Sequence, residues 1–273
     1  MMFDRFLSVF CFVSRIPVKI RFKFDVSRMD FYLPLVGIFP AFLGLAVYFL
    51  SLRLSDMCLF SAAAAIFVQY LGFNLFHLDG LADTADAFLG SVSREKRFAI
   101  LKDSRIGVYG LFAGFSALIF KLLLLYGLLR KSNDVFFNFP LSVFSIFIYP
   151  VSGRFSAALI PCMSPPAKPE GLGALAAGSN AFRAFAGTVT ALLIYSAVCL
   201  AAAYVFTGIL AFNVFFILIF FAIPLFAGLL SALFYARIYR RALGGYSGDA
   251  LGASIETGEI ICLLFTVIAS ASQ

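Results

Sequence analysis

The sequence contains no tryptophan and a single histidine, and only 13% of its 273 residues are charged. An ordinary soluble domain has about 25% charged and about 45–50% apolar residues. Here the apolar fraction is 62%, and phenylalanine alone accounts for 36 residues. A soluble fold of this length has no interior large enough to hide that much apolar surface. The composition excludes a soluble enzyme, a disordered regulator and a fibrous protein, and it predicts a multispanning membrane protein.

Paired cysteines and internal repeats are also absent. The cysteines have neither metal-ligand nor disulfide-framework spacing and stand singly, mostly in apolar stretches: Cys11, Cys58, Cys162, Cys199 and Cys262. No repeat is evident, which argues against an inverted-repeat transporter. The N-terminal apolar run lacks a small-residue cleavage site, so we expect no removable signal peptide.

Seven stretches are apolar enough and close enough to the required length of about 20 residues to cross a bilayer as helices. They cover residues 33–54, 57–76, 106–129, 135–152, 184–206, 209–236 and 253–270. The sequence therefore predicts an all-α, polytopic integral membrane helix bundle of about seven transmembrane helices. We expect it to form a single membrane-embedded domain over residues 1–273.

Basic residues are distributed unevenly between alternating loops. Most lie in the N-terminal segment and in three further loops of the same side, whereas the opposite loops hold only Arg53, Arg130 and Lys131. The positive-inside rule then places the N-terminus and the polar, glycine-rich segments in the cytoplasm, at a cell inner membrane. This asymmetry and anionic lipid headgroups explain the net charge of +7 more simply than nucleic acid does.

Three aspartates follow the second predicted span at helical spacing. Asp79, Asp83 and Asp86 stand at i, i+4 and i+7 and share an arc of about 60° on a helix. Like charges on one face repel, and no lysine or arginine at helical spacing neutralises them. A divalent cation such as Mg²⁺, which prefers hard oxygen ligands, would remove the repulsion. A solvated helix face just outside the membrane is the alternative interpretation.

The only histidine, His77, stands two residues before Asp79 and would point away from the aspartate face of a continuous helix. A capping or interfacial histidine is one interpretation. A role as a base or phosphate ligand is the other, and it requires a break in the helix near Leu78.

Two further segments carry candidate chemistry on the same side. Lys102 and Arg105 are three residues apart beside Gly107, a pattern that suits a phosphate. Glu256 and Glu259 share a helix face at the start of the last span, where carboxylates are costly and usually functional. We expect their partner to be the metal or the arginines of residues 237–241, and we expect Asp249 and both glutamates to approach the aspartate helix.

The polar segments resemble conserved blocks of the cobalamin synthase family. The aspartate block at residues 77–87 is long and specific, and it is followed by matching blocks at residues 94–97 and 101–107. Further matches lie at residues 14–17, 32–37, 169–173 and 245–253, in the family's order and over nearly the whole chain. One departure is the approach to the aspartates, where Asn74 and Phe76 stand in place of a glycine-rich stretch.

The resemblance implies an adenosylcobinamide-GDP ribazoletransferase, which performs the last assembly step of cobalamin. The enzyme would transfer the adenosylcobinamide-phosphate moiety to α-ribazole or its 5′-phosphate, release GMP and require Mg²⁺. Asp79, Asp83 and Asp86 would hold the metal, while Lys102 and Arg105 would offset charge on the phosphoryl oxygens. Asp86 or His77 would act as the base. Residues expected to contact substrate are Arg15, Asp103, Ser104, Gly248, Asp249, Glu256 and Glu259.

The expected partners are these two substrates and the lipid bilayer, with no nucleic acid. We also expect a homo-oligomer or an association with other enzymes of nucleotide-loop assembly. CDP-alcohol phosphotransferases and membrane prenyltransferases use similar carboxylates; the first family's arginine is missing here, whereas Asp249 with Glu256 could imitate the second family's second motif. A cation-coupled transporter would need carboxylates near the bilayer midplane, whereas here they cluster in one set of loops.

Overall fold

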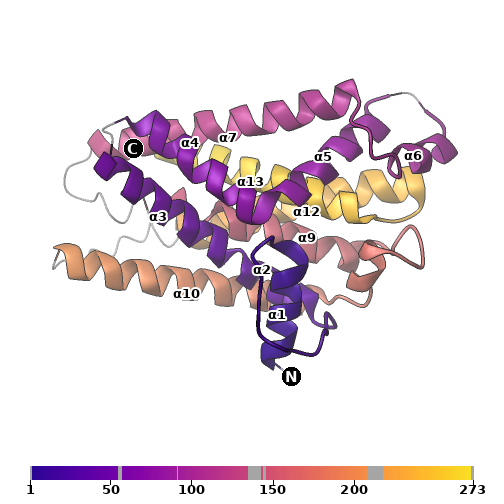
Figure 1. Ribbon diagram of the computed structural model, residues 1–273, viewed down its shortest axis with the longest axis horizontal. Coiled ribbons are helices and arrows are strands. Elements are labelled where there is room, and N and C mark those ends of the chain that lie inside the picture. Colours follow the sequence, from indigo (N-terminus) through magenta and orange to yellow (C-terminus); the bar gives the residue numbers. More distant parts are fainter. Residues whose placement is uncertain are drawn as a thin grey trace.

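The computed structural model describes residues 2–54, 57–90, 92–134, 143, 146–207 and 218–271, and in these ranges it contains helices and no β-strand. The α-helices and shorter helical turns are arranged as an elongated bundle (Figure 1). The α-helices are α1 (Met2–Val13), α2 (Met29–Val36), α3 (Ile38–Leu54), α4 (Cys58–Gln69), α5 (Leu75–Phe88), α6 (Arg94–Ile100), α7 (Val108–Asp134), α9 (Tyr149–Met163), α10 (Ala181–Thr207), α12 (Ile223–Leu243) and α13 (Gly248–Ala271). The π-turns η1 (Tyr70–Asn74) and η3 (Leu218–Ala222) and the 3₁₀-turn η2 (Leu172–Ala176) complete the set.

Six segments of the described chain are long and apolar enough to cross a membrane: Met29–Ser51, Cys58–Phe88, Val108–Lys131, Ala181–Val205, Phe220–Leu243 and Gly248–Ser270. They confirm the predicted multispanning helical class, and each matches one of the expected spans with shifted ends. The remaining expected span, 135–152, falls mostly outside the described residues. Helix α9 begins inside this expected span, at Tyr149. It continues beyond the expected end at residue 152 as far as Met163, and Arg154 is fully buried.

The second span is longer than a bilayer requires. Helices α4 and α5 run together through η1 for 31 residues, a length of about 46 Å against a hydrocarbon core of about 30 Å. The aspartates occupy the last turns of this composite helix, because α5 ends at Phe88. One end of the composite helix can therefore stand outside the hydrocarbon while its middle stays inside.

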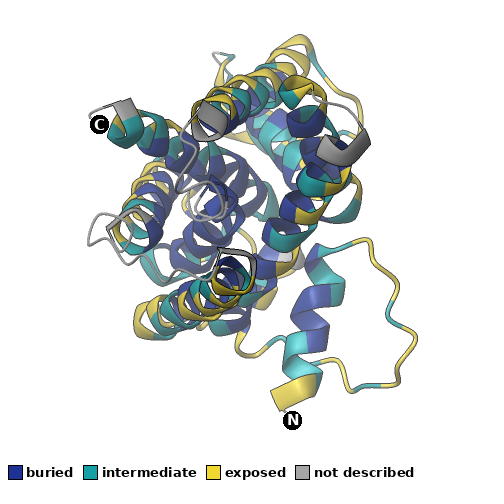
Figure 2. Ribbon diagram, turned by 90° about the vertical axis from the view of Figure 1, so that its left-hand side faces the viewer, coloured by how far each residue is buried: buried dark blue, intermediate teal, exposed yellow. Residues whose placement is uncertain are grey.

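The bundle is organised around α13, which packs against α5, α9, α12 and α7. Buried residues concentrate on the inward faces of the helices, while the outward faces are exposed (Figure 2). Small residues let the backbones approach closely, as is common between membrane helices. Gly153 of α9 lies against the backbone of Ile255, and Gly228 of α12 lies against the backbone of Ser152.

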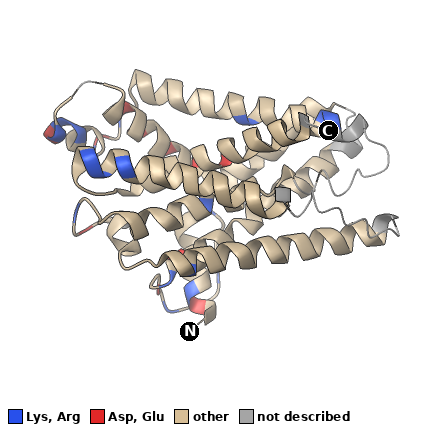
Figure 3. Ribbon diagram, turned by 180° about the vertical axis from the view of Figure 1, so that it is seen from behind, with Lys and Arg blue, Asp and Glu red and all other residues tan. Residues whose placement is uncertain are grey.

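Charged side chains gather mainly at one end of the bundle and around the N-terminus (Figure 3). That end contains α6 and the connection of residues 244–247 between α12 and α13. Helix α12 ends at Leu243 and is capped by Gly244, which adopts the left-handed conformation with φ of 84° and donates its N–H to the carbonyl of Arg240. Arg94 of α6 donates to the carbonyl of Leu243 at 2.8 Å, which ties α6 to the same end.

Gly153→Ala tests the close packing of α9 on α13. An added Cβ would lie 2.6 Å from the carbonyl oxygen of Ile255 and 2.7 Å from Cγ of Glu259. Overpacking costs about 1–3 kcal/mol, so we expect the melting temperature of the detergent-solubilised protein to fall by several degrees. Gly127→Ala in α7 is the matched control, because nothing lies within 4 Å of its Cβ position. Both variants gain the same helix propensity, so equal melting temperatures would contradict the packing described here.

Candidate active site

A cavity of about 260 Å³ opens at the charged end of the bundle. It lies between the end of α6, the loop around η2 and the start of α13. Three of the residues expected to act on substrate line it together: Lys102, Gly248 and Asp249. The other lining residues are Phe76, Phe98, Leu101, Pro166, Ala167, Lys168, Glu170, Gly171, Gly173, Ala174, Tyr246 and Ser247.

Two loops that form the cavity are held together by backbone hydrogen bonds. Ala167 donates its N–H to the carbonyl of Tyr246 at 2.7 Å, and Tyr246 donates its N–H to the carbonyl of Pro165 at 3.0 Å. This pairing is an isolated parallel bridge between Pro166 and Tyr246. Gly245 makes it possible, because any side chain there would collide with the backbone of residues 165–167.

The aspartate row of α5 lies beside the first turn of α13. A Cβ on Gly80 would lie 3.0 Å from the carbonyl oxygen and 3.1 Å from the Cα of Asp249, so a side chain there would push the two backbones apart. Asp83 consequently feels the repulsion of Asp79, Asp249 and Asp86. Asp79 is exposed and Asp83 half-buried, and within the described residues neither has a side-chain hydrogen bond or ion pair. The expected approach of Asp249 to the aspartate helix is confirmed.

Asp86 makes a different set of contacts. Its two carboxylate oxygens accept the N–H groups of Gly107 at 2.7 Å and Gly110 at 2.9 Å, at the start of α7. These N–H groups have no partner within their own helix, and they form the positive end of its dipole. Asp86 thus caps α7 from the neighbouring helix, a role that the sequence interpretation as metal ligand or base did not include.

The carboxylates of α5 and α13 fit a magnesium ion that also binds substrate. No three acidic, histidine or cysteine side chains in the described ranges converge into a ready-made metal site. Mg²⁺, however, usually keeps several waters and binds through one or two carboxylates together with substrate phosphates. Asp79 and Asp83 supply such oxygens, and their uncompensated charge favours a cation. Binding of Mg²⁺ itself stays a prediction.

The cations near the cavity differ from those expected. Lys102 lines it, as does Lys168, whose Nζ lies 4.7 Å from the centre of the Phe98 ring. Arg105 does not line it, because its guanidinium pairs with Asp103 at 2.6 Å and its side chain is 87% exposed. Hydrogen bonds from Arg105 lower the pKa of Asp103 to about 2. Lys168 stands directly before residues 169–173, which resemble a block of the family. This position is the sequence signal that could have identified Lys168 as a residue of the site.

Tyr246 lines the cavity, but its hydroxyl is enclosed by protein. Its side chain is buried, and its hydroxyl has no hydrogen-bond partner among the described residues. Burial raises the pKa of Tyr246 to about 12, so the hydroxyl stays protonated at neutral pH and can donate. Ser247 donates its hydroxyl to Asp249 at 3.0 Å and fixes that carboxylate at the start of α13. Neither Tyr246 nor Ser247 was among the residues expected to act on substrate.

His77 lies in the interior of the bundle, away from the cavity. Helix α5 is continuous across Leu78, so the break that a catalytic role for His77 requires is absent. The side chain is 2% exposed, and neither ring nitrogen has a partner among the described residues. Arg15 and Ser104, expected to contact substrate, are exposed and do not line the cavity.

Glu256 and Glu259 belong to a buried ion network and not to the cavity. Lys121 of α7 lies 2.6 Å from Glu256 and 2.5 Å from Glu259, and Arg154 of α9 also pairs with Glu259. All four side chains are at most 1% exposed. The expectation that their partner is a metal or the arginines of residues 237–241 is therefore wrong. Desolvation makes an unpaired charge at this depth prohibitive, so cations from α7 and α9 balance both carboxylates.

The π-turn η1 completes this network. Tyr70 donates its hydroxyl to Glu256 at 2.5 Å. Asn74 donates to Glu256 at 3.1 Å and to Glu259 at 3.0 Å, and it accepts a hydrogen bond from Arg154 at 2.8 Å. The irregular turn immediately before the aspartate helix is thus anchored to α7, α9 and α13 at once. Asn74, the departure from the family pattern, contributes an amide that both donates and accepts.

Lys121→Met should destabilise the protein strongly, because it leaves two buried carboxylates with Arg154 alone. Removing one partner of a buried pair costs about 3–5 kcal/mol. The double variant Lys121→Met with Glu256→Gln removes one charge of each sign and should recover part of that loss. Thermal unfolding of the purified single and double variants measures both effects. A single variant that melts like the wild type would contradict the network.

Comparison with known proteins identifies the family of the chain. The pattern of the cobalamin-5-phosphate synthase family matches residues 5–267. Relatives named adenosylcobinamide-GDP ribazoletransferase include one from Citrobacter koseri, 30% identical over 95% of this chain and 97% of its own, and one from Fervidobacterium nodosum, 29% identical over 94% of each chain. No solved structure matches the chain. The chain belongs to the cobalamin-5-phosphate synthase family.

Proposed function

We propose that the protein is an adenosylcobinamide-GDP ribazoletransferase that completes the assembly of cobalamin. A ribose hydroxyl of α-ribazole, or of its 5′-phosphate, attacks the phosphorus attached to cobinamide. The phosphorus–oxygen bond to GMP breaks, and GMP leaves. The observation that carries this proposal is the cavity at the charged end, which Asp249 lines together with Lys102 and Lys168. Asp79, Asp83 and Asp86 do not line it, but their helix packs against Asp249 at Gly80.

The residues around the cavity match the charges of a pyrophosphate substrate. Asp79 and Asp83 would hold Mg²⁺, which when bound stabilises negative charge on the pyrophosphate oxygens. Lys102 and Lys168 attract those oxygens directly, as ammonium groups do in phosphate sites. The cavity volume of about 260 Å³ suits the reacting phosphates, while the corrinoid would extend beyond it.

Asp249 is the side chain best placed to accept the proton of the attacking hydroxyl. It lines the cavity and is oriented by the hydroxyl of Ser247. Asp86 and His77, the bases expected from the sequence, are less suitable: both oxygens of Asp86 hold N–H groups of α7, and His77 is enclosed in the bundle. A base must reach its proton directly or through one water, which favours Asp249.

The competing functions have less support. Glu256 and Glu259, the acidic residues deepest in the bundle, are neutralised by fixed cations, whereas a cation-coupled transporter needs carboxylates free to exchange their partner. The family match does not favour a CDP-alcohol phosphotransferase or a prenyltransferase. A homo-oligomer, or an association with other enzymes of nucleotide-loop assembly, stays a prediction.

Release of GMP by the purified protein tests both the function and the metal site. With adenosylcobinamide-GDP, α-ribazole and Mg²⁺, the wild type should release GMP and join the two substrates. Asp83→Asn should lower turnover by about 100-fold or more, because it keeps the shape and removes the charge. Glu95→Gln, which neutralises an exposed carboxylate of α6, is the matched control and should retain wild-type turnover.

Two outcomes would contradict the proposal in different ways. No GMP release by well-folded wild type, in the presence of both substrates, would exclude the transferase. Wild-type turnover and Mg²⁺ response in a folded Asp83→Asn protein would exclude the metal assignment alone. Asp86→Asn tests the capping of α7 separately from catalysis. Asparagine has only one oxygen to accept the two N–H groups, so the melting temperature should fall even without substrate.

The charged end of the bundle, in our proposal, faces the cytoplasm of a cell inner membrane. Lys96 lies in α6, which precedes the start of α7, and Arg130 lies near the end of α7, which runs for 27 residues. The test uses intact cells that express a variant of the protein without its natural cysteines. In this background, Arg130→Cys should react with a membrane-impermeant maleimide. Lys96→Cys should react only after permeabilisation. The reverse pattern would invert the orientation.

A further inference from the structure

Three arginines of α12 have no role in the site described above. Arg237, Arg240 and Arg241 are exposed on its last turns, and within the described residues no carboxylate pairs with their side chains. The negative end of the helix dipole favours cations there and offsets part of their mutual repulsion. The helix dipole offsets this repulsion only in part, so three guanidinium groups share one short surface. This positive surface is complementary to an anion.

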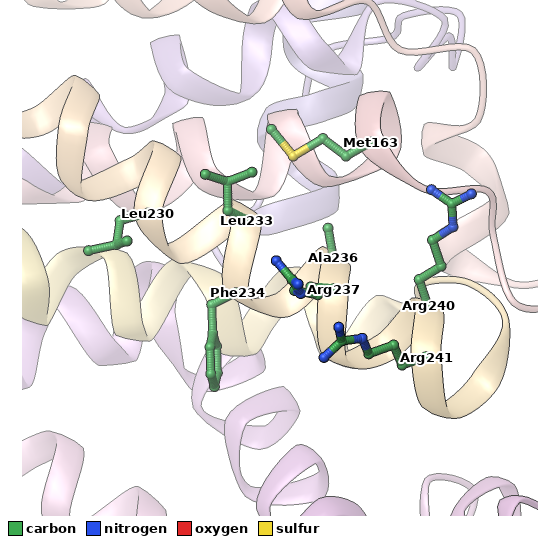
Figure 4. Close-up of a pocket in the computed structure, with 8 residues that line it drawn as sticks. All are labelled: Met163, Leu230, Leu233, Phe234, Ala236, Arg237, Arg240 and Arg241. Atoms are coloured by element: carbon green, nitrogen blue, oxygen red, sulfur yellow. The ribbon is translucent and has the colours of Figure 1, made fainter.

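These arginines border a groove of about 710 Å³ whose other walls are apolar (Figure 4). Leu230, Leu233 and Phe234 line it on α12, and Met163 at the end of α9 lines the opposite side. The three α12 side chains are 42%, 50% and 55% exposed, respectively. An exposed apolar surface that ends in free cations is complementary to a molecule with an apolar part and an anionic group.

The spacing of these residues matches one leaflet of a bilayer. Leu233 and Phe234 stand three and four residues after Leu230. Arg237 follows them by four and three residues, and Arg241 stands four residues after Arg237, so all five share one face of α12. The eleven-residue rise corresponds to about 16 Å, about half of a hydrocarbon core of about 30 Å. A small soluble anion would use only the arginines, whereas the apolar length fits an acyl chain lying below its own headgroup.

We propose that this groove binds one anionic diacyl phospholipid. Its phosphate lies against Arg237, Arg240 and Arg241, whose planar donors suit phosphate oxygens, and an acyl chain lies along Leu230, Leu233 and Phe234. Arg240 also lines a second recess with Pro165 and Pro166, in the loop that is paired with Tyr246 at the active site. The bound lipid therefore lies next to the loop that forms one wall of the catalytic cavity.

Native mass spectrometry of the full chain in a neutral detergent tests the site. Phosphatidylglycerol is added to one sample, and phosphatidylcholine with the same acyl chains to another. The protein should retain one molecule of phosphatidylglycerol, and it should retain it far more strongly than phosphatidylcholine. The variant Arg237→Gln, Arg240→Gln and Arg241→Gln should weaken that retention by about 100-fold. The control removes the same charge from an exposed loop outside this groove, by Lys19→Gln, Arg21→Gln and Lys23→Gln, and should retain the lipid.

Thermal unfolding of the wild type gives a second measurement that needs no variant. Phosphatidylglycerol should raise the melting temperature, and inorganic phosphate at the same concentration should not. Equal protection by phosphate, or equal retention of phosphatidylcholine, would overturn the proposal, and so would loss of retention in the control variant. Displacement of the lipid by adenosylcobinamide-GDP would instead assign the groove to the substrate. None of these outcomes depends on the transfer reaction itself.

Discussion

The ion pairs of Lys121 and Arg154 with Glu256 and Glu259 lie where water can neither solvate nor screen them. Such charges persist only while every partner stays in place. They therefore require α7, α9 and α13 to hold one arrangement, and through Tyr70 and Asn74 they impose it on the helix that carries the aspartates. The interior of this membrane protein is thus specified by polar contacts as much as by apolar packing.

Sequence patterning predicted what is local or periodic. The composition and apolar runs indicated the helical membrane class, and the spacing of Asp79 and Asp83 placed them on one helix face. The partners of Glu259 could not be predicted in this way, because Lys121 and Arg154 stand 138 and 105 residues away and only the packing joins them. The cap that Asp86 forms on α7 likewise depends on a tertiary contact, between residues 21 positions apart.

The catalytic end combines rigid and loop-borne parts. Carboxylates come from helices α5 and α13, whose close approach is fixed at Gly80. Lys168 comes from a loop that two backbone hydrogen bonds hold to Tyr246, and Lys102 comes from the loop after α6. In a phosphoryl transfer, where the chemistry needs mainly positioning and charge stabilisation, this division keeps the proposed metal ligands fixed while the loops can adapt to a large corrinoid.

The π-turn at Tyr70–Asn74 has one further consequence. A π-turn takes up one residue more than an α-helical turn, and each residue of an α-helix advances it by about 100°. Every side chain downstream of η1 is therefore set back by about 100° from its direction in an uninterrupted helix. An uninterrupted helix would turn Asp79, Asp83 and Asp86 about 100–160° away from the exposed Phe67 of α4, and the set-back brings all three within about 60° of it. One surplus residue in the middle of the second span thus decides which side of that span carries the carboxylates.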